Sequence, residues 1–239
     1  MKEQASVAVL VIGNEILSGK TQDANLQFLG EAFARLGIRF AEARVIPDEP
    51  EIIATVVNEC RKRYTYVFTT GGIGPTHDDI TADSVARGFG VDLVLNEDAA
   101  RRIGRGSRDL NPARLKMAMI PDGASLIDNP VSHAPGFRME NVYVLAGIPS
   151  IARAMFGAIE HELDGGDPIQ SESIDIYARE GDFAATLEEI AARHGDVEIG
   201  SYPFSREGRF GASIVVRGTD AAHVKLVLNE IQSVLGRGD

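Results

Sequence analysis

The stretch TTGGIGPTHDDIT, residues 69–81, decides which fold the sequence predicts. Glycine occupies positions 71, 72 and 74, directly after the β-branched and aromatic run 67–70 and directly before an apolar-periodic segment that starts near Thr81. This order predicts a strand, a glycine-rich loop and the first turn of a helix. Such a junction presents unpaired backbone N–H groups where the helix dipole also favours negative charge. The stretch is therefore a candidate site for a phosphate or a carboxylate.

Two acids complicate this simple anion site. Asp78 and Asp79 follow the glycines, and carboxylates repel a phosphate unless a cation stands between them. The simpler interpretation is a tight strand-to-helix turn, with Asp79 or Thr81 as the helix cap. A cap needs one such side chain, whereas five polar residues occupy six positions here: Thr76, His77, Asp78, Asp79 and Thr81. That excess favours a metal-and-phosphate site, although His77 by itself is more often a solvent-facing loop residue.

The glycine loop lacks the features of two common nucleotide sites. No Gly-Lys-Ser/Thr follows it, as a P-loop requires, and a GxGxxG dinucleotide fingerprint would be expected after the first strand rather than here. The sequence also contains no HExxH, no paired CxxC and no GxSxG elbow. Ordinary NTPase chemistry, zinc proteolysis and serine hydrolysis therefore lose support, and no NAD(P)-type redox cofactor is expected.

The composition is that of an ordinary globular protein. Of 239 residues, 44% are hydrophobic and 25% are charged, and no apolar run approaches the roughly 18 residues that a membrane helix needs. The N-terminal segment has no cleavage-site pattern, and a single cysteine, Cys60, cannot form an internal disulfide. We therefore expect a cytoplasmic protein that does not bind a membrane, with Cys60 in a buried packing role on a helix.

The net charge of −11 argues against nucleic-acid binding, because affinity for a duplex comes mostly from neutralising phosphates. One segment departs from this acidity: residues 101–116 carry six basic side chains and one acid, Asp109. A solvated helix face is the simple interpretation, and contact with the phosphates of a small anionic ligand is the alternative. The basic residues are Arg101, Arg102, Arg105, Arg108, Arg114 and Lys116.

Strands and helices alternate as far as residue 163. Alternation of this kind implies right-handed βαβ units and a doubly wound parallel sheet, with ligands beyond the carboxyl ends of the strands. Strands are predicted at 7–12, 39–46, 67–70, 93–95 and 142–145, and helices at 25–36, 50–60, 82–89, 98–105, 112–119 and 149–163, with a polar loop at 14–24 and an irregular loop at 129–136.

A turn-rich segment, residues 164–168 (DGGDP), marks the clearest boundary in the chain. Beyond it the order changes to a small α+β pattern, βαββα. The predicted elements are a strand at 174–178, a helix at 183–194, an antiparallel pair at 197–202 and 211–217 joined through residues 204–209, and a terminal helix at 224–235. We therefore predict two domains, at 1–165 and 170–239.

Acidic side chains follow two different strands of the predicted sheet. Asp48 comes after the strand at 39–46, and Asp79 comes after the strand at 67–70. Because parallel strands end at one edge of a sheet, the fold class alone could bring both carboxylates to the same crevice. The simple interpretation of Asp48 is a turn residue after Pro47. Glu15, after the first strand, is likewise either loop polarity or a ligand contact.

Several ordered motifs resemble one known family. They are GNEILSG at 13–19 followed by Asn25, VIPDE at 45–49, the glycine stretch at 69–81, KMAMIP at 116–121 and NPVSHAPGF at 129–137. Together they resemble the molybdopterin-binding MoaB/Mog domain, in the variety found in the competence/damage-inducible protein A (CinA) family. The resemblance covers about residues 5–165, and the βαββα tail is similar to the small domain that follows in those proteins.

The resemblance implies a three-layer α/β fold with a mostly parallel sheet. The two acids of the family's site fall on Asp48 and Asp79, with Asp78 beside them. In Mog-type relatives these acids serve molybdopterin adenylylation with a divalent metal. In the CinA branch, and in the similar domain of eukaryotic FAD synthases, the implied activity is metal-dependent hydrolysis of a dinucleotide pyrophosphate. The expected cofactor is Mg²⁺, or Co²⁺ or Mn²⁺ in its place, with K⁺ as a further candidate.

The leading hypothesis is therefore a metal-dependent nucleotide pyrophosphatase acting on ADP-ribose, FAD or a similar ADP-containing dinucleotide. Its catalytic residues would be Asp48 and Asp79, and its metal ligands Asp48, Asp78 and Asp79. Substrate or phosphate would bind Gly71, Gly72, Gly74, Pro75, Thr76, Glu15, Asn25 and Lys116.

Two other hypotheses stay open at this point. One is a non-catalytic protein that binds molybdopterin or a nucleotide and serves molybdenum cofactor metabolism. The other is an interaction module whose glycine loop is only a turn. The binding-protein hypothesis and the leading hypothesis both predict a small phosphate-containing ligand, either a dinucleotide or a pterin. Mog-type relatives often form trimers, so a homo-oligomer is expected.

The sequence departs from the family in two ways. It ends at Asp239, so we expect a stand-alone form without the C-terminal amidase domain of CinA proteins or the adenylyltransferase domain of FAD synthases, and without either activity. Where CinA proteins have a proline-rich LPGPPSE-like segment, residues 145–151 are LAGIPSI, so the acid after the serine is missing. That difference leaves the choice of substrate open.

Overall fold

The structure is a computed structural model, and it describes residues 4–106, 110–206 and 208–236. These residues fall into two compact units, one within 1–33 and 38–166 and the other within 34–37 and 167–239. Each unit has a hydrophobic core of its own. Among the helices of the described segments, none combines the length and the apolarity that crossing a membrane would require.

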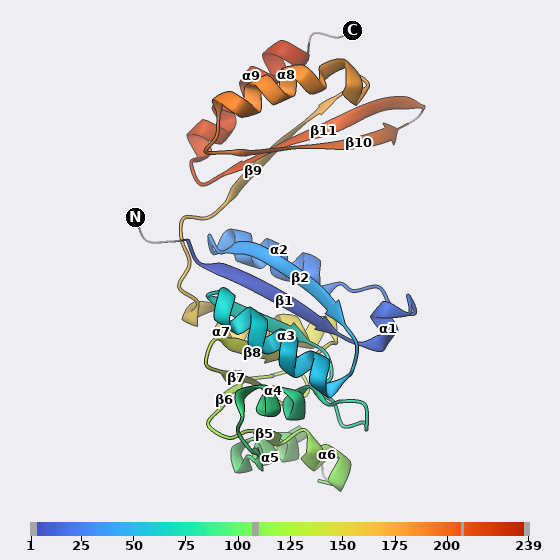
Figure 1. Cartoon of the computed structure of the whole chain (residues 1–239), viewed down its shortest axis with the longest axis vertical. Helices are drawn as coiled ribbons and strands as arrows, with labels where there is room; N and C mark the ends of the chain where they lie inside the picture. The colour runs from blue at the N-terminus through green and yellow to red at the C-terminus, as the bar shows by residue number, and fades with distance from the viewer. Residues whose placement is uncertain (1–3, 107–109, 207, 237–239) are drawn as a thin grey trace. The chain divides into compact units, whose positions relative to one another are not determined.

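The first unit alternates strands and helices (Figure 1). In chain order they are β1 (Ser6–Ile12), α1 (Asn14–Leu17), α2 (Asn25–Arg35), β2 (Arg39–Ile46), α3 (Pro50–Arg63), β3 (Tyr66–Thr70), α4 (Thr81–Phe89), β4 (Leu93–Leu95), α5 (Glu97–Gly106), α6 (Pro112–Lys116), β5 (Met119–Pro121), β6 (Ser125–Ile127), β7 (Gly136–Met139), β8 (Val142–Leu145), α7 (Pro149–Ile159) and the 3₁₀ helix η1 (Glu160–Glu162).

The central sheet of this unit is mostly parallel. Within the described residues its strands lie in the order β2-β1-β3-β8-β7-β6. β1 pairs in parallel with both β2 and β3, and β3 pairs in parallel with β8. β7 and β6 then continue the sheet in antiparallel fashion, and β4 and β5 form a separate antiparallel pair. The predicted α/β class with a mostly parallel sheet is confirmed.

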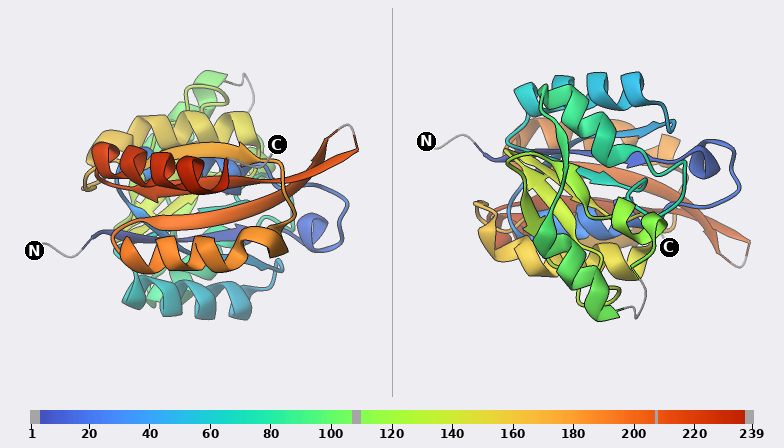
Figure 2. Two further views of the ribbon diagram at one scale, coloured as in Figure 1. Left: turned by 90° about the horizontal axis from the view of Figure 1, so that it is seen from above. Right: turned by 90° about the horizontal axis from the view of Figure 1, so that it is seen from below.

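Helices cover both faces of this sheet, which gives three layers. Leu10 and Val67 pack in one core with residues of α3 and α4. On the other face Phe68 contacts Phe33 of α2 and Phe156 of α7, with ring centroids 5.0 and 5.8 Å apart. Figure 2 shows α3 and α7 on opposite sides of the strands. The continuous apolar sequence of β1 follows from this arrangement, because a strand covered on both faces has no solvated side.

Several predicted boundaries in the first unit were wrong. The polar loop predicted at 14–24 begins with the short helix α1, and the helix predicted at 112–119 ends at Lys116. Met119–Pro121 forms strand β5, and two further strands, β6 and β7, flank the loop predicted at 129–136. These strands are three or four residues long. A period of two residues cannot show over such a length, and these segments also lack the unbroken apolar run of the equally short β4 and β8, which were predicted.

The second unit is a three-stranded antiparallel sheet with two helices on one face. Its described elements are β9 (Gln170–Ile176), α8 (Glu180–Arg193), β10 (Glu198–Arg206), β11 (Arg209–Gly218) and α9 (Ala221–Leu235), in the predicted βαββα order. The strand order is β10-β11-β9, so β11 is central. Its residue Ile214 is fully buried with Phe183 of α8 and Val227 of α9.

The hairpin of the second unit is longer than predicted. Residues 204–209 were expected to form the connection, but Phe204 pairs with Gly211 and Arg206 pairs with Arg209 in the β10–β11 ladder. The prediction failed because this part of the hairpin is rich in Gly, Ser and Arg, a composition that is typical of a loop.

Candidate functional site

The candidate site lies at the edge of the central sheet where β2, β1 and β3 end side by side (Figure 1). One loop leaves the sheet after each of these strands. The loop after β1 is tied to the loop after β2, because Gly13 N donates to Ile46 O at 3.2 Å and Asn14 N donates to Asp48 Oδ2 at 2.8 Å. The Asp48 carboxylate is therefore positioned by a neighbouring loop, and its role goes beyond that of a turn residue.

The glycine loop after β3 starts with two residues of left-handed backbone. Gly71 has a φ of 104° and Gly72 a φ of 68°, which residues with a side chain rarely adopt. A Cβ on Gly71 would lie 2.2 Å from Ile12 O, so the loop packs directly on the end of β1. Buried Thr81 closes the loop, because its N donates to Gly72 O and its Oγ1 to Gly71 O, both at 2.9 Å. The backbone of this loop is thereby fixed before any ligand binds.

Asp79 bonds within the glycine loop and does not cap α4. Its Oδ2 accepts hydrogen bonds from Thr76 N at 2.8 Å and from Thr76 Oγ1 at 2.5 Å. The residue at the cap position is Ile80, and α4 has no side-chain cap bond, so neither Asp79 nor Thr81 has the capping role that the simpler interpretation gave them. Lys116, from α6, donates its Nζ to Thr76 O. A cation and a carboxylate are therefore both attached to the same loop.

Asn25 reaches the site from the start of α2. Helix α2 is capped by Asp23, whose Oδ1 accepts a hydrogen bond from Leu26 N at 2.8 Å. Asn25 Nδ2 instead donates to Gly147 O, in the loop after β8, at 2.8 Å. Its Oδ1 is buried and has no hydrogen-bond partner among the described residues. Because an unsatisfied buried acceptor is costly, this oxygen marks a place where a donor from water or a ligand would be stabilised.

Three polar side chains at this edge are exposed. The Glu15 carboxylate folds back on the chain, since a Cβ on Gly13 would lie 2.6 Å from both of its oxygens. The side chains of Asp78 and His77 are 66% and 99% exposed. The pKa of Asp78 is lowered by Thr76 and by its own backbone N–H, and in smaller part by His77. Asp78 is therefore ionised at neutral pH, as a metal ligand has to be.

Contacts join the predicted site residues into two groups. Asp48 and Glu15 lie on the loops after β2 and β1, whereas the glycine loop with Lys116 forms a second group after β3. In residues 4–106, 110–206 and 208–236, the side-chain hydrogen bond of Asp48 goes to the loop after β1, and those of Asp79 stay within the glycine loop. In the same residues no three His, Cys, Asp or Glu side chains are grouped so as to hold a metal ion. The metal and catalytic roles of these acids remain predictions.

The donor set nevertheless suits a hard divalent cation that is shared with a substrate. Mg²⁺ is usually bound through one or two carboxylates together with waters and substrate phosphates, rather than by a cage made of protein alone. Asp48 and Asp79 each use Oδ2 in the bonds given above, and nothing in the described part of the chain hydrogen-bonds to either Oδ1. Each acid therefore keeps an oxygen with which it can bind a cation.

A small pocket lies beside the glycine loop. Its volume is about 80 Å³, and its lining includes Gly72, Gly74, Asp79 and Lys116 together with apolar side chains. A water occupies roughly 30 Å³, so the pocket holds only a few waters or one small group. A whole dinucleotide is larger than this volume, so most of such a ligand would lie outside the pocket.

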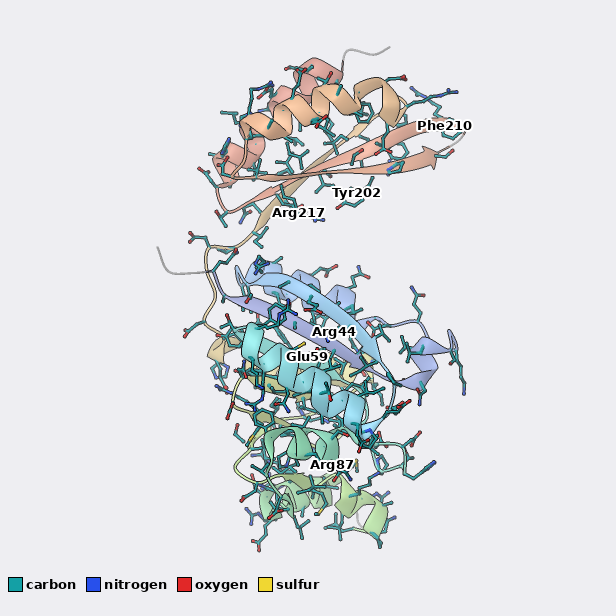
Figure 3. The ribbon with its side chains drawn as sticks, viewed as in Figure 1. Arg44, Glu59, Arg87, Tyr202, Phe210 and Arg217 are labelled. Atoms are coloured by element: carbon teal, nitrogen blue, oxygen red, sulfur yellow. The ribbon has the colours of Figure 1, made fainter. Side chains whose placement is uncertain are left out.

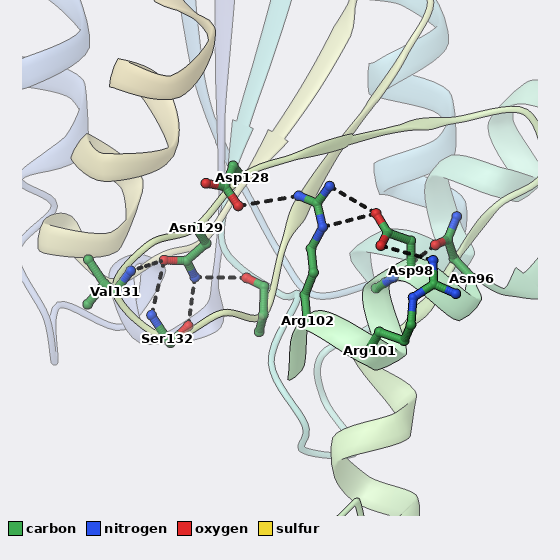
Figure 4. A network of polar contacts seen from close by, with 10 residues as sticks. Asn96, Asp98, Arg101, Arg102, Asp128, Asn129, Val131 and Ser132 are labelled. Carbon is green, nitrogen blue, oxygen red and sulfur yellow. Dashed lines mark hydrogen bonds and ion pairs between the residues drawn. The ribbon is translucent and has the colours of Figure 1, made fainter. Parts of the chain in front are cut away.

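Basic side chains of the segment 101–116 form ion pairs within the first unit. Arg102 pairs with Asp98, at 2.9 Å from Nη2 to Oδ2, and with Asp128, at 3.3 Å from Nη1 to Oδ1 (Figure 4). These ion pairs support the interpretation of a solvated face for α5. Residues 108 and 109 of the segment lie outside the described residues.

Sequence reasoning missed several buried polar groups at the site. The Oγ1 atoms of Thr69 and Thr70, the last residues of β3, are buried without a hydrogen-bond partner among the described residues. Threonine is common in strands, so no signal in the sequence distinguished these two hydroxyls from ordinary strand residues. The Gly147 carbonyl was missed as well. Its partner, Asn25, could be found only as part of a family motif.

The fold and the site together define a class of protein. It is a three-layer α/β domain whose glycine-rich strand-to-helix junction and acidic loops lie beyond the carboxyl ends of parallel strands, where such folds bind ligands. Residues 8–164 match the model of a family described as a probable molybdopterin binding domain, and residues 168–238 match the middle domain of FAD synthase. Because the first match spans more than half of the chain, the chain belongs to this MoaB/Mog-like molybdopterin-binding-domain family.

Individual relatives agree with this assignment. A protein of Archaeoglobus fulgidus is 31% identical over 227 residues, which cover 95% of this chain and 96% of that protein. A probable FAD synthase of Caenorhabditis elegans is 28% identical over 98% of this chain, and the match covers 51% of the synthase, so the chain spans about half of its length. The crystal structure of the protein CinA from Thermoplasma acidophilum is 34% identical with a TM-score of 0.63, covering 66% of this chain and 98% of that one. The predicted resemblance to MoaB/Mog and CinA proteins is confirmed.

Proposed function

We propose that this protein is a metal-dependent nucleotide pyrophosphatase that hydrolyses an ADP-containing dinucleotide of the ADP-ribose or FAD type. The observation that supports this proposal best is that two carboxylates follow strands that end at the same edge of the sheet. Asp48 follows β2 and Asp79 follows β3, and these strands lie on either side of β1. The matches to the FAD synthase middle domain and to a probable FAD synthase make FAD a reasonable first compound to test.

The glycine loop would bind the pyrophosphate through its backbone. Gly71, Gly72 and Gly74 leave room for close approach, and the bonds from Thr81 hold the loop in one conformation. Pro75 and Thr76 continue the same surface. Lys116, already bonded to Thr76 O, places a positive charge next to it. A preorganised site of this kind stabilises negative charge that develops in the transition state.

The acids would hold the cation and orient the attacking water. A bound divalent cation would supply charge neutralisation at the phosphates and a more acidic water. Asp48 and Asp79 would contribute the ligating oxygens, with Asp78 beside them. Asn25 would use its unsatisfied Oδ1 to accept a hydrogen bond from the ligand or from an ordered water.

The reaction consumes one water and breaks one P–O bond. The water oxygen attacks one phosphorus atom of the pyrophosphate, and the bridging P–O bond breaks with its electron pair on the leaving phosphate. One proton of the water is lost to solvent or to the leaving group. ADP-ribose would give AMP and ribose 5-phosphate, and FAD would give AMP and FMN.

A second candidate function is a non-catalytic carrier of molybdopterin or a nucleotide. It is favoured by the description of the matching family and by the lack of a three-acid metal group among the described residues. Such a carrier would bind the ligand through the same loop without releasing AMP. The expected homo-oligomer also stays a prediction, which light scattering on the purified protein would test.

The deciding experiment is to incubate the protein with ADP-ribose or FAD and Mg²⁺ or Co²⁺ and to measure AMP by chromatography. We expect AMP release that EDTA abolishes. Asp79→Asn and Asp48→Asn should each reduce the rate by at least about a hundredfold, because each removes a carboxylate that would hold the cation. Asp92→Asn, at an exposed position after α4, is the matched control and should keep the wild-type rate. Tight binding of nucleotide or pterin without any AMP would support the carrier instead.

A further inference from the structure

The sheet of the second unit has one face that its helices do not cover. Ala212, Ile214 and Val216 of β11 point toward α8 and α9, where they are fully buried. Because side chains alternate along a strand, Gly211, Ser213, Val215 and Arg217 lie on the opposite face. The ladder places Phe204, Tyr202 and Gly200 of β10 next to the first three of these. Figure 3 shows Tyr202 and Arg217 on the side of the sheet away from both helices.

Two aromatic rings lie against the backbone on this face. A Cβ on Gly200 would lie 2.9 Å from Cε2 of Tyr202, and a Cβ on Gly211 would lie 2.7 Å from Cζ of Phe204. Any larger residue at either position would lift its ring off the sheet. The glycines therefore allow the rings to lie low over the strands. The Tyr202 residue is 47% exposed, so one side of its ring is available for stacking.

Arginines lie over two aromatic rings of this face, those of Phe204 and Tyr177. Arg206 lies over the Phe204 ring, with its guanidinium carbon 4.2 Å from the ring centroid, and Arg209 lies over the Tyr177 ring at 4.5 Å. Arg206 also pairs with Asp175 at 2.5 Å. Among the described residues, no carboxylate forms an ion pair with Arg209 or Arg217, although Glu198 is the cross-strand neighbour of Arg217. In a chain with a net charge of −11, a face with unpaired cations and aromatic rings is a local exception.

The geometry points to a second ligand site on this face, separate from the glycine loop. We propose that Tyr202 stacks on the planar heteroaromatic ring of a nucleotide and that Arg217, on the same face of the neighbouring strand β11, binds its phosphate. Flat aromatic residues combined with arginine are the means by which sheets bind unpaired bases. An apolar protein partner fits less well, because Asp175, Ser173 and Ser213 lie on the same face. The net acidity of the chain favours a small nucleotide over a long nucleic acid.

The simpler explanation is that the rings only protect the glycines of the sheet. Aromatic side chains over glycines stabilise designed and natural sheets without any ligand. That explanation requires stability to fall when Tyr202 is removed, and it gives the ring no effect on ligand affinity. The two explanations therefore differ in a quantity that can be measured.

The test is a fluorescence titration of FMN and of riboflavin with the full chain in EDTA, since stacking on tyrosine quenches flavin fluorescence. Riboflavin has the same ring as FMN and lacks its phosphate. We expect saturable quenching, with a Kd for FMN that rises about tenfold or more in Tyr202→Ala and stays within about twofold of wild type in Tyr202→Phe. Arg217→Gln should weaken FMN severalfold and leave riboflavin unchanged.

The matched control is Phe210→Ala. Phe210 is 63% exposed on the same hairpin but precedes Gly211, so its side chain leaves the strand on the other face. Its removal should not change the Kd. The proposal is overturned if wild-type protein does not quench FMN, or if Tyr202→Ala lowers thermal stability but keeps the wild-type Kd. It is also overturned if a single-stranded oligonucleotide binds this face more tightly than FMN and displaces it.

Discussion

Gly71 is the residue at which the loops of the site meet. Its N donates to Leu145 O at 3.2 Å, its O accepts from Thr81 Oγ1, and a Cβ on Gly147 would lie 3.2 Å from its Cα. Its own missing Cβ would lie 2.2 Å from Ile12 O. The carbonyl is backbone and cannot swing away as a flexible side chain could. Glycine is therefore required here by both the φ angle and the available space.

We predict that Gly71→Ala lowers the free energy of unfolding by about 3 kcal/mol or more, because left-handed strain and a backbone clash add together. Gly90→Ala is the control, since Gly90 also has a positive φ, of 69°, but has nothing within 4 Å of the added Cβ. It should cost about 1 to 2 kcal/mol, for the strain alone. Urea unfolding of the two variants measures the difference. Equal losses would show that the close approach of Gly71 to β1 does not constrain the loop.

At the scale of elements, β2 is the edge strand next to β1 and is protected by charge. Glu42 accepts hydrogen bonds from Arg44 at 2.6 Å and from Tyr64, and Arg44 also pairs with Glu59 of α3 at 2.7 Å. Figure 3 shows Arg44 and Glu59 between β2 and α3. An edge strand with free hydrogen-bonding groups invites pairing with other chains, and charged side chains discourage it. Cys60 of α3 is fully buried in the core of the first unit, so its predicted packing role is confirmed.

The carboxyl of Glu42 also makes the stability of the first unit depend on pH. Its pKa is lowered from the ordinary 4.5, first by the hydrogen bond from Arg44 and then by that from Tyr64. Because the pKa is lower in the folded state, Glu42 stabilises the fold at pH values above its unfolded pKa. This contribution is lost as the pH falls through the folded pKa.

We predict that Glu42→Gln lowers the free energy of unfolding by about 1 kcal/mol near neutral pH, where the wild-type carboxylate is charged and bonded. The difference from wild type should shrink as the pH is lowered below 4.5, because protonation then removes the same charge. Urea unfolding at a series of pH values checks this. A difference that stays constant at low pH would mean that the charge of Glu42 does not contribute.

At the scale of the whole molecule, each unit buries a core that the other does not share. Ile53 belongs to the core of the first unit, and Ile214 belongs to the core of the second. Both side chains are 0% exposed. A core of its own is the condition for a unit to unfold as a separate step.

We therefore predict two transitions in calorimetry. Ile53→Ala should lower one of them and Ile214→Ala the other, each by about 2 to 5 kcal/mol of local stability. At a temperature where the first unit stays folded, Ile214→Ala should also leave AMP release unchanged, because the proposed catalytic residues all lie in the first unit. A single transition that both substitutions shift equally would contradict separate unfolding.

The helices and strands differ in how well the sequence pattern predicted them. Strands with a continuous apolar run, such as β1 and β8, and helices with one hydrophobic period, such as α3, were predicted close to their observed bounds. The short strands β5, β6 and β7 were missed. Their existence depends on neighbouring strands such as β8, which supply the hydrogen bonds that a three- or four-residue segment cannot provide for itself.

The sequence by itself determined the α/β class, the βαββα tail, and the strand, glycine loop and helix at 69–81, because these depend on local periodicity and on the backbone freedom of glycine. Only the tertiary structure decided what the site residues contact. Asn25 bonds Gly147 across 122 positions, and Asp48 bonds Asn14 across 34. In the simpler interpretation Asp79 or Thr81 was only a helix cap, yet both residues close the loop instead. The Tyr202 face exists only once β10 and β11 pair. Such contacts join residues whose proximity is set by the packing of the whole sheet, and no local pattern encodes it.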